Sequence, residues 1–258
     1  MDIIDMHAHV FPPAVAKKAV DNLGSYYNYT MHGTGTFEDL TKSAKQAGVG
    51  RLVICSTATR PDQVENINTY LSGLITDHVA AFGSLHRDYE NFEAEIDRME
   101  HLGLKGVKLH PDFQEFDMDD KKMFPIYEAL EGRLPILFHV GDETSDRSAP
   151  KRLARVLENF PKLTAIGAHL GGYSRWDEAM EFLIGKNLYI DTSSVFRRLR
   201  KEQVTEIIKK HGVDKVLFGT DYPLERHDYP LENILALRLS DDEKEQILYT
   251  NAYNLIFR

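Results

Sequence analysis

RLVICST, residues 51–57, is a short run of apolar and β-branched residues that ends in two hydroxyl side chains. Runs of this composition are typical of strands buried in a parallel sheet. Seven further runs of this kind follow the same pattern: IIDMH from residue 3, VAAFGSL from 79, LKGVKLH from 104, LPILFHV from 134, LTAIGAHL from 163, NLYIDTS from 187 and DKVLFGTD from 214. The sequence therefore predicts eight buried strands.

The spacing of these runs indicates how the strands are connected. From residue 51 onwards they begin 24 to 30 residues apart, which is enough for a strand, a helix and two loops but too long for a hairpin. Between them lie stretches with helical period, such as FEDLTKSAKQAG from residue 37, for which Thr36 is a suitable N-cap. Strand and helix units repeated in this way over 258 residues predict a (β/α)8 barrel, formed by residues 1–258 as a single domain.

The composition excludes several classes of function. Lys and Arg number 31 against 40 Asp and Glu, a net charge of -9, and the basic clusters are too short to predict a nucleic-acid surface. No apolar stretch approaches the ~18 residues of a membrane-spanning helix, and the chain begins without a secretory signal pattern. We therefore expect a cytoplasmic protein that acts on a small molecule and binds neither nucleic acid nor membrane. The sequence leaves open whether it forms a homo-oligomer.

Histidines stand at the ends of several predicted strands. His7 and His9 are two residues apart in MHAHV, so in an extended strand they project from one face. The other strand-end groups of this kind are His110, His139, His169 and Asp221. In a (β/α)8 barrel the carboxyl ends of all strands meet at one mouth, where catalytic residues gather. Because burying several imidazoles and a carboxylate without compensation is costly, the pattern predicts one bound divalent metal ion.

The types of donor narrow the choice of metal and reaction. Imidazole nitrogens with one carboxylate oxygen suit Zn²⁺, our first expectation, and also Mn²⁺ or Fe²⁺. A metal ion with an open position lowers the pKa of bound water to about 7, and Asp221 next to it could accept the proton. The same ion could instead orient an unsaturated or aromatic carboxylate while a protonated group delivers H⁺ to carbon and CO₂ leaves. The residues alone leave hydrolysis and decarboxylation open.

These motifs resemble those of a known family. The H-x-H of MHAHV, the histidines of LFHVG and GAHLGG, and the aspartate of FGTDYP together resemble the amidohydrolase superfamily, in particular the branch that contains aminocarboxymuconate-semialdehyde decarboxylase. KGVKLHP and TNAYNL also resemble that branch, so the resemblance covers nearly the whole chain. It implies a single metal ion held by His7, His9, His139 and Asp221. His169 would then transfer a proton, polarise the substrate or serve as an extra ligand.

Positive side chains near the predicted mouth bear on the substrate. Lys108 shares a strand face with His110, and the pair could contact an anionic substrate or pair with carboxylates such as Asp112. A carboxylated Lys108 could alternatively bridge two metal ions, as in some members of the superfamily, with His169 on the second ion. Arg197, after the strand run from 187, is a further candidate for binding a substrate carboxylate. Residues 24–36, GSYYNYTMHGTGT, predict a loop over the mouth.

We therefore expect a metal-dependent hydrolase that attacks a small ester, lactone or amide, with a carboxylate on the substrate. Catalysis is assigned to Asp221 and His169. Nonoxidative decarboxylation is the alternative reaction. A barrel that binds metal or ligand without catalysis is the alternative of another class.

Overall fold

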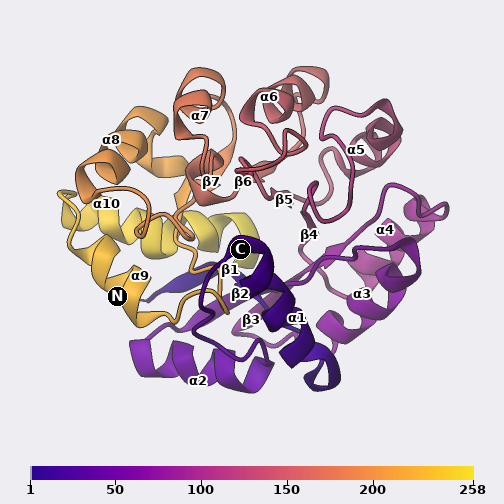
Figure 1. Ribbon diagram of the computed structural model, residues 1–258, viewed down its shortest axis with the longest axis horizontal. Helices are drawn as coiled ribbons and strands as arrows, with labels where there is room; N and C mark the ends of the chain where they lie inside the picture. The colour runs from indigo at the N-terminus through magenta and orange to yellow at the C-terminus, as the bar shows by residue number, and fades with distance from the viewer. Residues whose placement is uncertain (1) are drawn as a thin grey trace. The chain divides into compact units, whose positions relative to one another are not determined.

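Eight parallel strands make up one sheet in the order β1 to β8 in the computed structural model, which describes residues 2–258. Strands and helices alternate along the chain (Figure 1). The strands are β1 Ile4–His9, β2 Arg51–Cys55, β3 Val79–Ser84, β4 Gly106–Leu109, β5 Ile136–Phe138, β6 Ala165–Gly167, β7 Tyr189–Asp191 and β8 Val216–Leu217. Ala8 also forms a parallel bridge with Tyr222, so the first strand meets the segment after the last one. This order confirms the predicted (β/α)8 barrel.

Helices follow the strands as the spacing predicts. They are α1 Pro13–Tyr27, α2 Phe37–Ala47, α3 Val64–Ser72, α4 Phe92–His101, α5 Phe124–Leu130, α6 Pro150–Asn159, α7 Trp176–Phe182, α8 Lys201–His211, α9 Asp228–Leu235 and α10 Asp241–Glu245. Thr36 caps α2 as predicted, because its hydroxyl oxygen accepts the N–H of Asp39 at 3.3 Å. The loop predicted from residue 24 begins later than expected. Helix α1 continues to Tyr27 and ends at Asn28, whose φ of 49° is left-handed.

The described chain divides into two compact units. The first comprises residues 2–55, 76–80 and 192–258, and the second comprises residues 56–75 and 81–191. The first unit contains β1, β2 and β8, and the second contains β4 to β7. Each unit carries part of the set of strand-end histidines and carboxylates.

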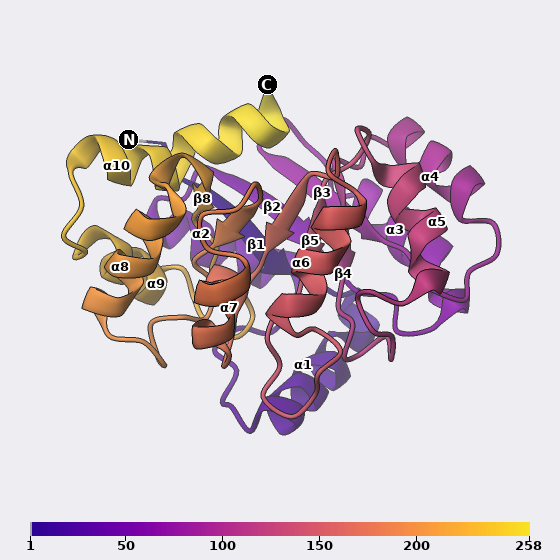
Figure 2. The same ribbon diagram turned by 90° about the horizontal axis from the view of Figure 1, so that it is seen from above.

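The C-terminal segment packs against the strands of the first unit. Beyond α10 it continues as two π-helical segments, Gln246–Thr250 and Tyr253–Phe257, drawn in yellow in Figure 2. Ile247 is fully buried, and its carbonyl accepts the N–H of Phe218 at 3.0 Å. The guanidinium of Arg51 at the start of β2 lies 5.7 to 5.9 Å from the ring centres of Tyr249, Tyr253 and Phe257. Apolar packing and these ring contacts hold the end of the chain against the first strands.

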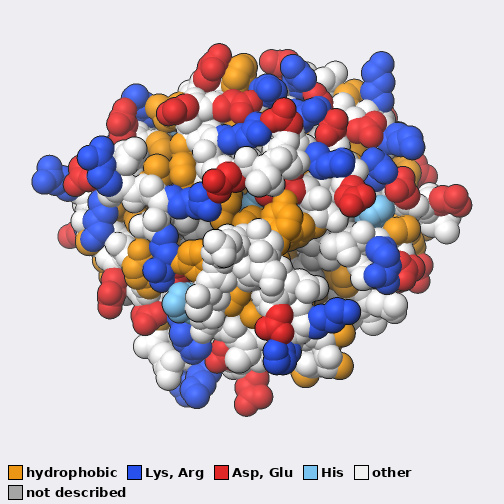
Figure 3. Space-filling view, viewed as in Figure 1, with side chains coloured by type: hydrophobic (Ala, Val, Ile, Leu, Met, Phe, Trp, Pro, Cys, Tyr) orange, Lys and Arg blue, Asp and Glu red, His pale blue; other side chains and the backbone are white. Residues whose placement is uncertain are grey.

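The face shown in Figure 3 carries both charges. Basic and acidic side chains alternate over it and form no wide basic patch there. Within residues 2–258, no helix combines the length and apolar character needed to cross a bilayer.

Candidate metal centre

The first unit brings together three side chains predicted as metal ligands. His7 and His9 lie on one face of β1, and their Nε2 atoms are 3.1 Å apart. Asp221, after β8, places Oδ1 3.5 Å from Nε2 of His7 and 3.4 Å from Nε2 of His9. Metal–ligand bonds of about 2.1 Å separate neighbouring donor atoms by about 3.0 Å in octahedral and about 3.4 Å in tetrahedral geometry. The three donor atoms thus have the mutual spacing of ligands around one divalent ion.

Asp221 is held in this position by its backbone and by a neighbouring hydroxyl. Its φ is 61°, in the left-handed region, which aspartate tolerates better than most residues. Its N–H donates to the carbonyl of His7 at 2.8 Å. Ser194 Oγ donates to its Oδ2 at 2.6 Å. The carboxylate is therefore oriented with Oδ1 towards the two imidazoles.

Two further side chains contact the outer nitrogens of these imidazoles. His7 Nδ1 lies 3.1 Å from Ser193 Oγ, and His9 Nδ1 lies 3.6 Å from Cys55 Sγ. Cys55 is 1% exposed, and the sequence does not predict its contact with His9. Such partners fix the tautomer and the orientation of histidine ligands. In the sequence, the only indication that Cys55 and Ser193 support the two histidines is their place at the ends of the runs RLVICST and NLYIDTS.

The surroundings of His9 favour a positive charge. Burial by itself lowers the pKa of an imidazole, but the Cys55 sulfur and the Asp221 carboxylate outweigh burial and raise the pKa of His9 from 6.5 to about 9. In the metal-free protein, protonation of His9 therefore stabilises the fold fully below pH 6.5, and this contribution is lost as the pH rises through 9. A divalent ion bound through His9 would need the neutral imidazole, so we expect metal and proton to compete for it.

We expect zinc uptake by the metal-free protein to displace about one proton from His9 at pH 7 and about half a proton at pH 9. Zinc should therefore bind more tightly as the pH rises towards 9, because fewer molecules carry the competing proton. Titration of zinc into weakly buffered protein with an indicator dye measures the release. Protein already loaded with zinc is the control and should release none. Equal proton release at both pH values would contradict the raised pKa.

The second unit brings three other strand-end histidines together. His139 Nδ1 lies 3.1 Å from His169 Nε2, and the rings of His110 and His139 stack with centroids 4.0 Å apart. The three residues are at most 5% exposed. The ring of Tyr173 lies 5.7 Å from that of His139 and 5.2 Å from that of His169, a neighbour that the sequence does not predict. Three of the predicted strand-end histidines thus converge within this unit.

The backbone after β6 sets the direction of His169. The φ values of His169 and Leu170 are 60° and 52°, so both residues are left-handed and the strand ends before them. The N–H of His169 donates to Asp191 Oδ1 at 3.0 Å, which fixes the turn. The loop after β5 approaches this region closely. A Cβ added to Gly141, at φ 90°, would lie 2.4 Å from the carbonyl oxygen of Gly172, so glycine is required there.

Lys108 and His110 lie at the end of β4 in the second unit. Lys108 is fully buried, and His110 follows the strand with 5% exposure. The N–H of His110 donates to Gln114 Oε1 at 2.9 Å. Its Nδ1 lies 3.8 Å from Asp112 Oδ2, a long contact with the carboxylate that the sequence suggested as a partner. Burial raises the pKa of Asp112, which favours its neutral form.

Arg197, the predicted binder of a substrate carboxylate, is already engaged within the first unit. Its guanidinium forms an ion pair with Glu225, with Nη2 3.1 Å from Oε2. It also lies 4.5 Å from the ring centre of Tyr229 and 5.5 Å from that of Tyr29. Tyr29 OH donates to Oε1 of the same Glu225 at 2.7 Å. The guanidinium is therefore held between two rings and a carboxylate.

The predicted site residues divide between the two units. The first unit holds His7, His9, Arg197 and Asp221, and the second holds Lys108, His110, His139 and His169. His7, His9 and Asp221 converge in the first unit, and His110, His139 and His169 converge in the second. The union of both sets in one metal centre stays a prediction.

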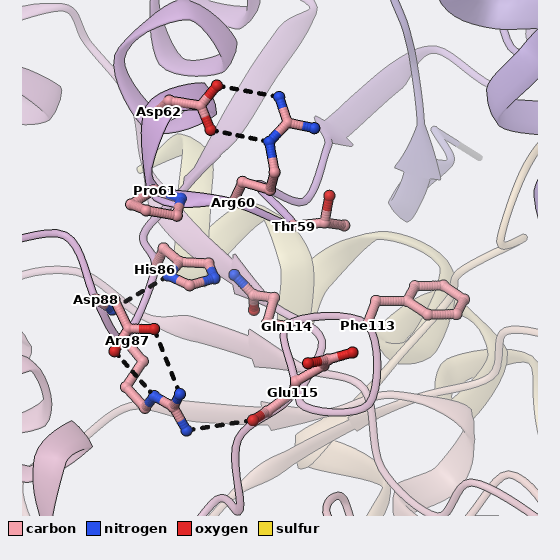
Figure 4. A pocket seen from close by; sticks show the side chains of 10 residues that line it. All are labelled: Thr59, Arg60, Pro61, Asp62, His86, Arg87, Asp88, Phe113, Gln114 and Glu115. Atoms are coloured by element: carbon pink, nitrogen blue, oxygen red, sulfur yellow. Dashed lines mark hydrogen bonds and ion pairs between the residues drawn. The ribbon is translucent and has the colours of Figure 1, made fainter.

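A separate pocket lies in the second unit and is lined by residues 59–62, 86–88 and 113–115 (Figure 4). Its wall includes Arg60 and Arg87, each paired with a neighbouring carboxylate. Arg60 Nε donates to Asp62 Oδ1 at 3.0 Å, and Arg87 Nε donates to Asp88 Oδ1 at 3.2 Å. Both guanidinium groups are therefore paired with carboxylates of the wall itself.

The sequence model of the amidohydrolase family matches residues 4–258. The chain belongs to the amidohydrolase family. This match confirms the expected family over nearly the whole chain. It also confirms the expectation that this amidohydrolase is an enzyme.

Comparison with individual proteins gives more distant relatives. The chain is 25% identical over 150 residues to gamma-resorcylate decarboxylase of Polaromonas sp., a match that covers 50% of this chain and 45% of that protein. The match thus spans about half the length of that relative. Among solved structures, a dihydroxybenzoic acid decarboxylase from Polaromonas sp. with bound manganese is 15% identical, with a TM-score of 0.74 over 98% of this chain and 96% of the other. A putative 2-pyrone-4,6-dicarboxylic acid hydrolase from Pseudomonas putida is 19% identical, with a TM-score of 0.71 over 98% and 97%. At these identities the structures show the shared fold.

Proposed function

We propose that the protein is a metal-dependent enzyme that removes the carboxyl group of a small aromatic or unsaturated carboxylate without oxidation. The observation that carries this proposal is the mutual spacing of the donor atoms of His7, His9 and Asp221, which suits one divalent ion. Membership of the amidohydrolase family supports an enzyme. The decarboxylase of Polaromonas sp. supports the reaction and ranks it above the hydrolysis expected from the sequence.

We propose that His139 supplies a further imidazole to the same ion, as the resemblance implies. Because its Nδ1 contacts His169, its coordinating atom would be Nε2. Zinc is our first choice, manganese is supported by the Polaromonas decarboxylase structure, and iron also suits the donor set. When bound, such an ion supplies a positive charge that polarises substrate oxygens. Elemental analysis of protein purified without chelator should find about one ion per chain; two ions would favour the site bridged by carboxylated Lys108.

The reaction needs one group that binds the substrate carboxylate and another that moves a proton. We propose Lys108 and His110 for the carboxylate, since both lie at the end of β4. Arg197 would have to leave Glu225 to take that role. We propose Asp221 and His169 for proton transfer. The bond from ring or chain carbon to the carboxyl group breaks, its electron pair stays on that carbon, and one proton joins the carbon as CO₂ leaves.

Hydrolysis of a small ester, lactone or amide is the second candidate. It is favoured by the likeness of fold to the putative 2-pyrone-4,6-dicarboxylic acid hydrolase. In this reaction Asp221 would take a proton from the attacking water and pass it to the leaving group.

We expect metal-loaded protein to release CO₂ from at least one member of a panel of hydroxybenzoates and unsaturated carboxylates. In D₂O the product should carry one solvent deuterium at the carbon that lost the carboxyl group. Lactones, esters and amides are assayed in parallel. Hydrolytic turnover without CO₂ would replace decarboxylation by the second candidate. No turnover on either panel would favour a barrel that binds without catalysis.

A further inference from the structure

Asp5 connects the two segments that carry His7 and Asp221. It lies on β1 and is fully buried. Its Oδ1 accepts the backbone N–H groups of His7 and Thr220, both at 3.0 Å. Its Oδ2 accepts the hydroxyl of Thr220 at 2.6 Å. One carboxylate thus joins the backbone of His7 to the residue that precedes Asp221.

The strand register explains why the backbone of His7 needs this partner. β1 pairs with β2 so that Asp5 lies opposite Leu52 and Ala8 lies opposite Ile54. β1 therefore has one more residue than β2 between these pairs, which is a β-bulge. Within the bulge, the N–H of His7 bonds to the side chain of Asp5. The carboxylate supports the irregular backbone from which His7 projects.

A buried histidine and serine hold Asp5 from the other side. His227 is fully buried, and its Nε2 lies 3.1 Å from Asp5 Oδ2, off the line of a regular hydrogen bond. Ser43 Oγ, on α2, accepts the backbone N–H of His227 at 3.2 Å and lies 2.9 Å from its Nδ1. If the Ser43 hydroxyl donates to Nδ1, the ring proton is on Nε2 and faces Asp5. The three side chains form a continuous buried chain of contacts from α2 to β1.

We propose that Asp5, held by His227 and Ser43, is a positioning residue that sets the spacing of the ligands His7 and Asp221. The inference rests on the proposed metal site and adds residues that contact no donor atom. Asp5 acts on the backbone beneath two ligands from segments more than two hundred residues apart, as the hydrogen bond from Thr220 shows. When two ligands already stand at the distance that one ion requires, the ion binds without a costly rearrangement of the backbone.

The test compares zinc affinity in four proteins by competition with a chromophoric chelator. Asp5→Asn should weaken zinc binding by about 10- to 100-fold, the usual effect of removing an outer partner of a metal site. Ser43→Ala should weaken it less, by about threefold to tenfold, since it loosens Asp5 only through His227. Glu95→Gln is the matched control, because Glu95 is a buried carboxylate bonded to Asn68 and Arg98. It should bind zinc as the wild type does.

The absorption spectrum of the cobalt-loaded proteins gives a second readout that a general loss of stability would not produce. Its bands should shift in Asp5→Asn and Ser43→Ala and stay in place in Glu95→Gln, because only the first two alter ligand geometry. Wild-type affinity and an unchanged spectrum in both site variants would overturn the inference while leaving the metal site intact. A wild-type protein that binds no metal would instead overturn the proposed function and this inference with it. Should Asp5→Asn fail to fold, Ser43→Ala decides.

Discussion

Replacing Asp221 with Asn is expected to lower turnover by about a thousandfold and to weaken zinc binding by about 10- to 100-fold, with the fold retained. Asn carries no negative charge and has a single carbonyl oxygen, so it is a poorer ligand and no proton acceptor. The fold should persist because Asn adopts the left-handed φ of 61° readily. Its amide oxygen can also accept the hydrogen bond from Ser194. Zinc content per chain and the steady-state rate on the substrate found by the panel are measured together.

A matched control separates this effect from the loss of any part-buried carboxylate. The side chain of Asp119 is 15% exposed against 18% for Asp221, and it pairs with Arg152 and Arg155. Asp119→Asn should leave zinc affinity and turnover within about twofold of the wild type. Full zinc affinity in Asp221→Asn would contradict its assignment as a ligand. Full turnover would contradict its role in proton transfer.

Removal of the metal is expected to abolish turnover and to lower the midpoint of thermal unfolding by about 10 °C. An ion that binds only the folded protein, present at about a thousand times its dissociation constant, stabilises the fold by about 4 kcal/mol. For a chain of this size, each kcal/mol shifts the midpoint by about 2 to 4 °C. Calorimetry before and after dialysis against a chelator measures the shift, and readdition of zinc should restore both properties.

The same dialysis applied to a protein that lacks a ligand provides the control. His7→Ala removes one of the three donors that lie at ligand spacing, so the chelator should change its midpoint far less. An equal shift in both proteins would mean that the chelator acts elsewhere. An unchanged midpoint in the wild type, with elemental analysis showing that the metal has left, would contradict a stabilising metal centre.

The strands were predictable because their signal is local. Each of the eight apolar runs coincides with one observed strand, although β1 extends two residues beyond its run to His9. The repeat of strand and helix units predicts the order of the sheet. The limits of the strands were less predictable. β6 covers only Ala165–Gly167 of the run from 163 to 170, because His169 and Leu170 adopt left-handed φ. Composition does not reveal such a turn, since the hydrogen bond from His169 to Asp191 fixes it.

The convergence of the proposed ligands could be expected in part from the pattern of the chain. His7 and His9 are two residues apart on a strand, so they lie on one face. The pairing of β1 with the segment after β8 then brings Asp221 to them. The role of Arg197 shows the opposite case. From the sequence it is a candidate for binding a substrate carboxylate, because it follows a strand. In the structure its guanidinium is paired with Glu225 and lies against two tyrosine rings.

The sequence by itself determined the repeated strand and helix units, the family and the residue types of the candidate metal centre. Tertiary structure alone decided which side chains support those residues: Cys55 beside His9, Ser194 on the Asp221 carboxylate, and Asp5 with His227 beneath the bulge of β1. The physical reason is range. Periodicity and strand propensity act over a few neighbouring residues, whereas these contacts join distant segments that meet only when the sheet forms.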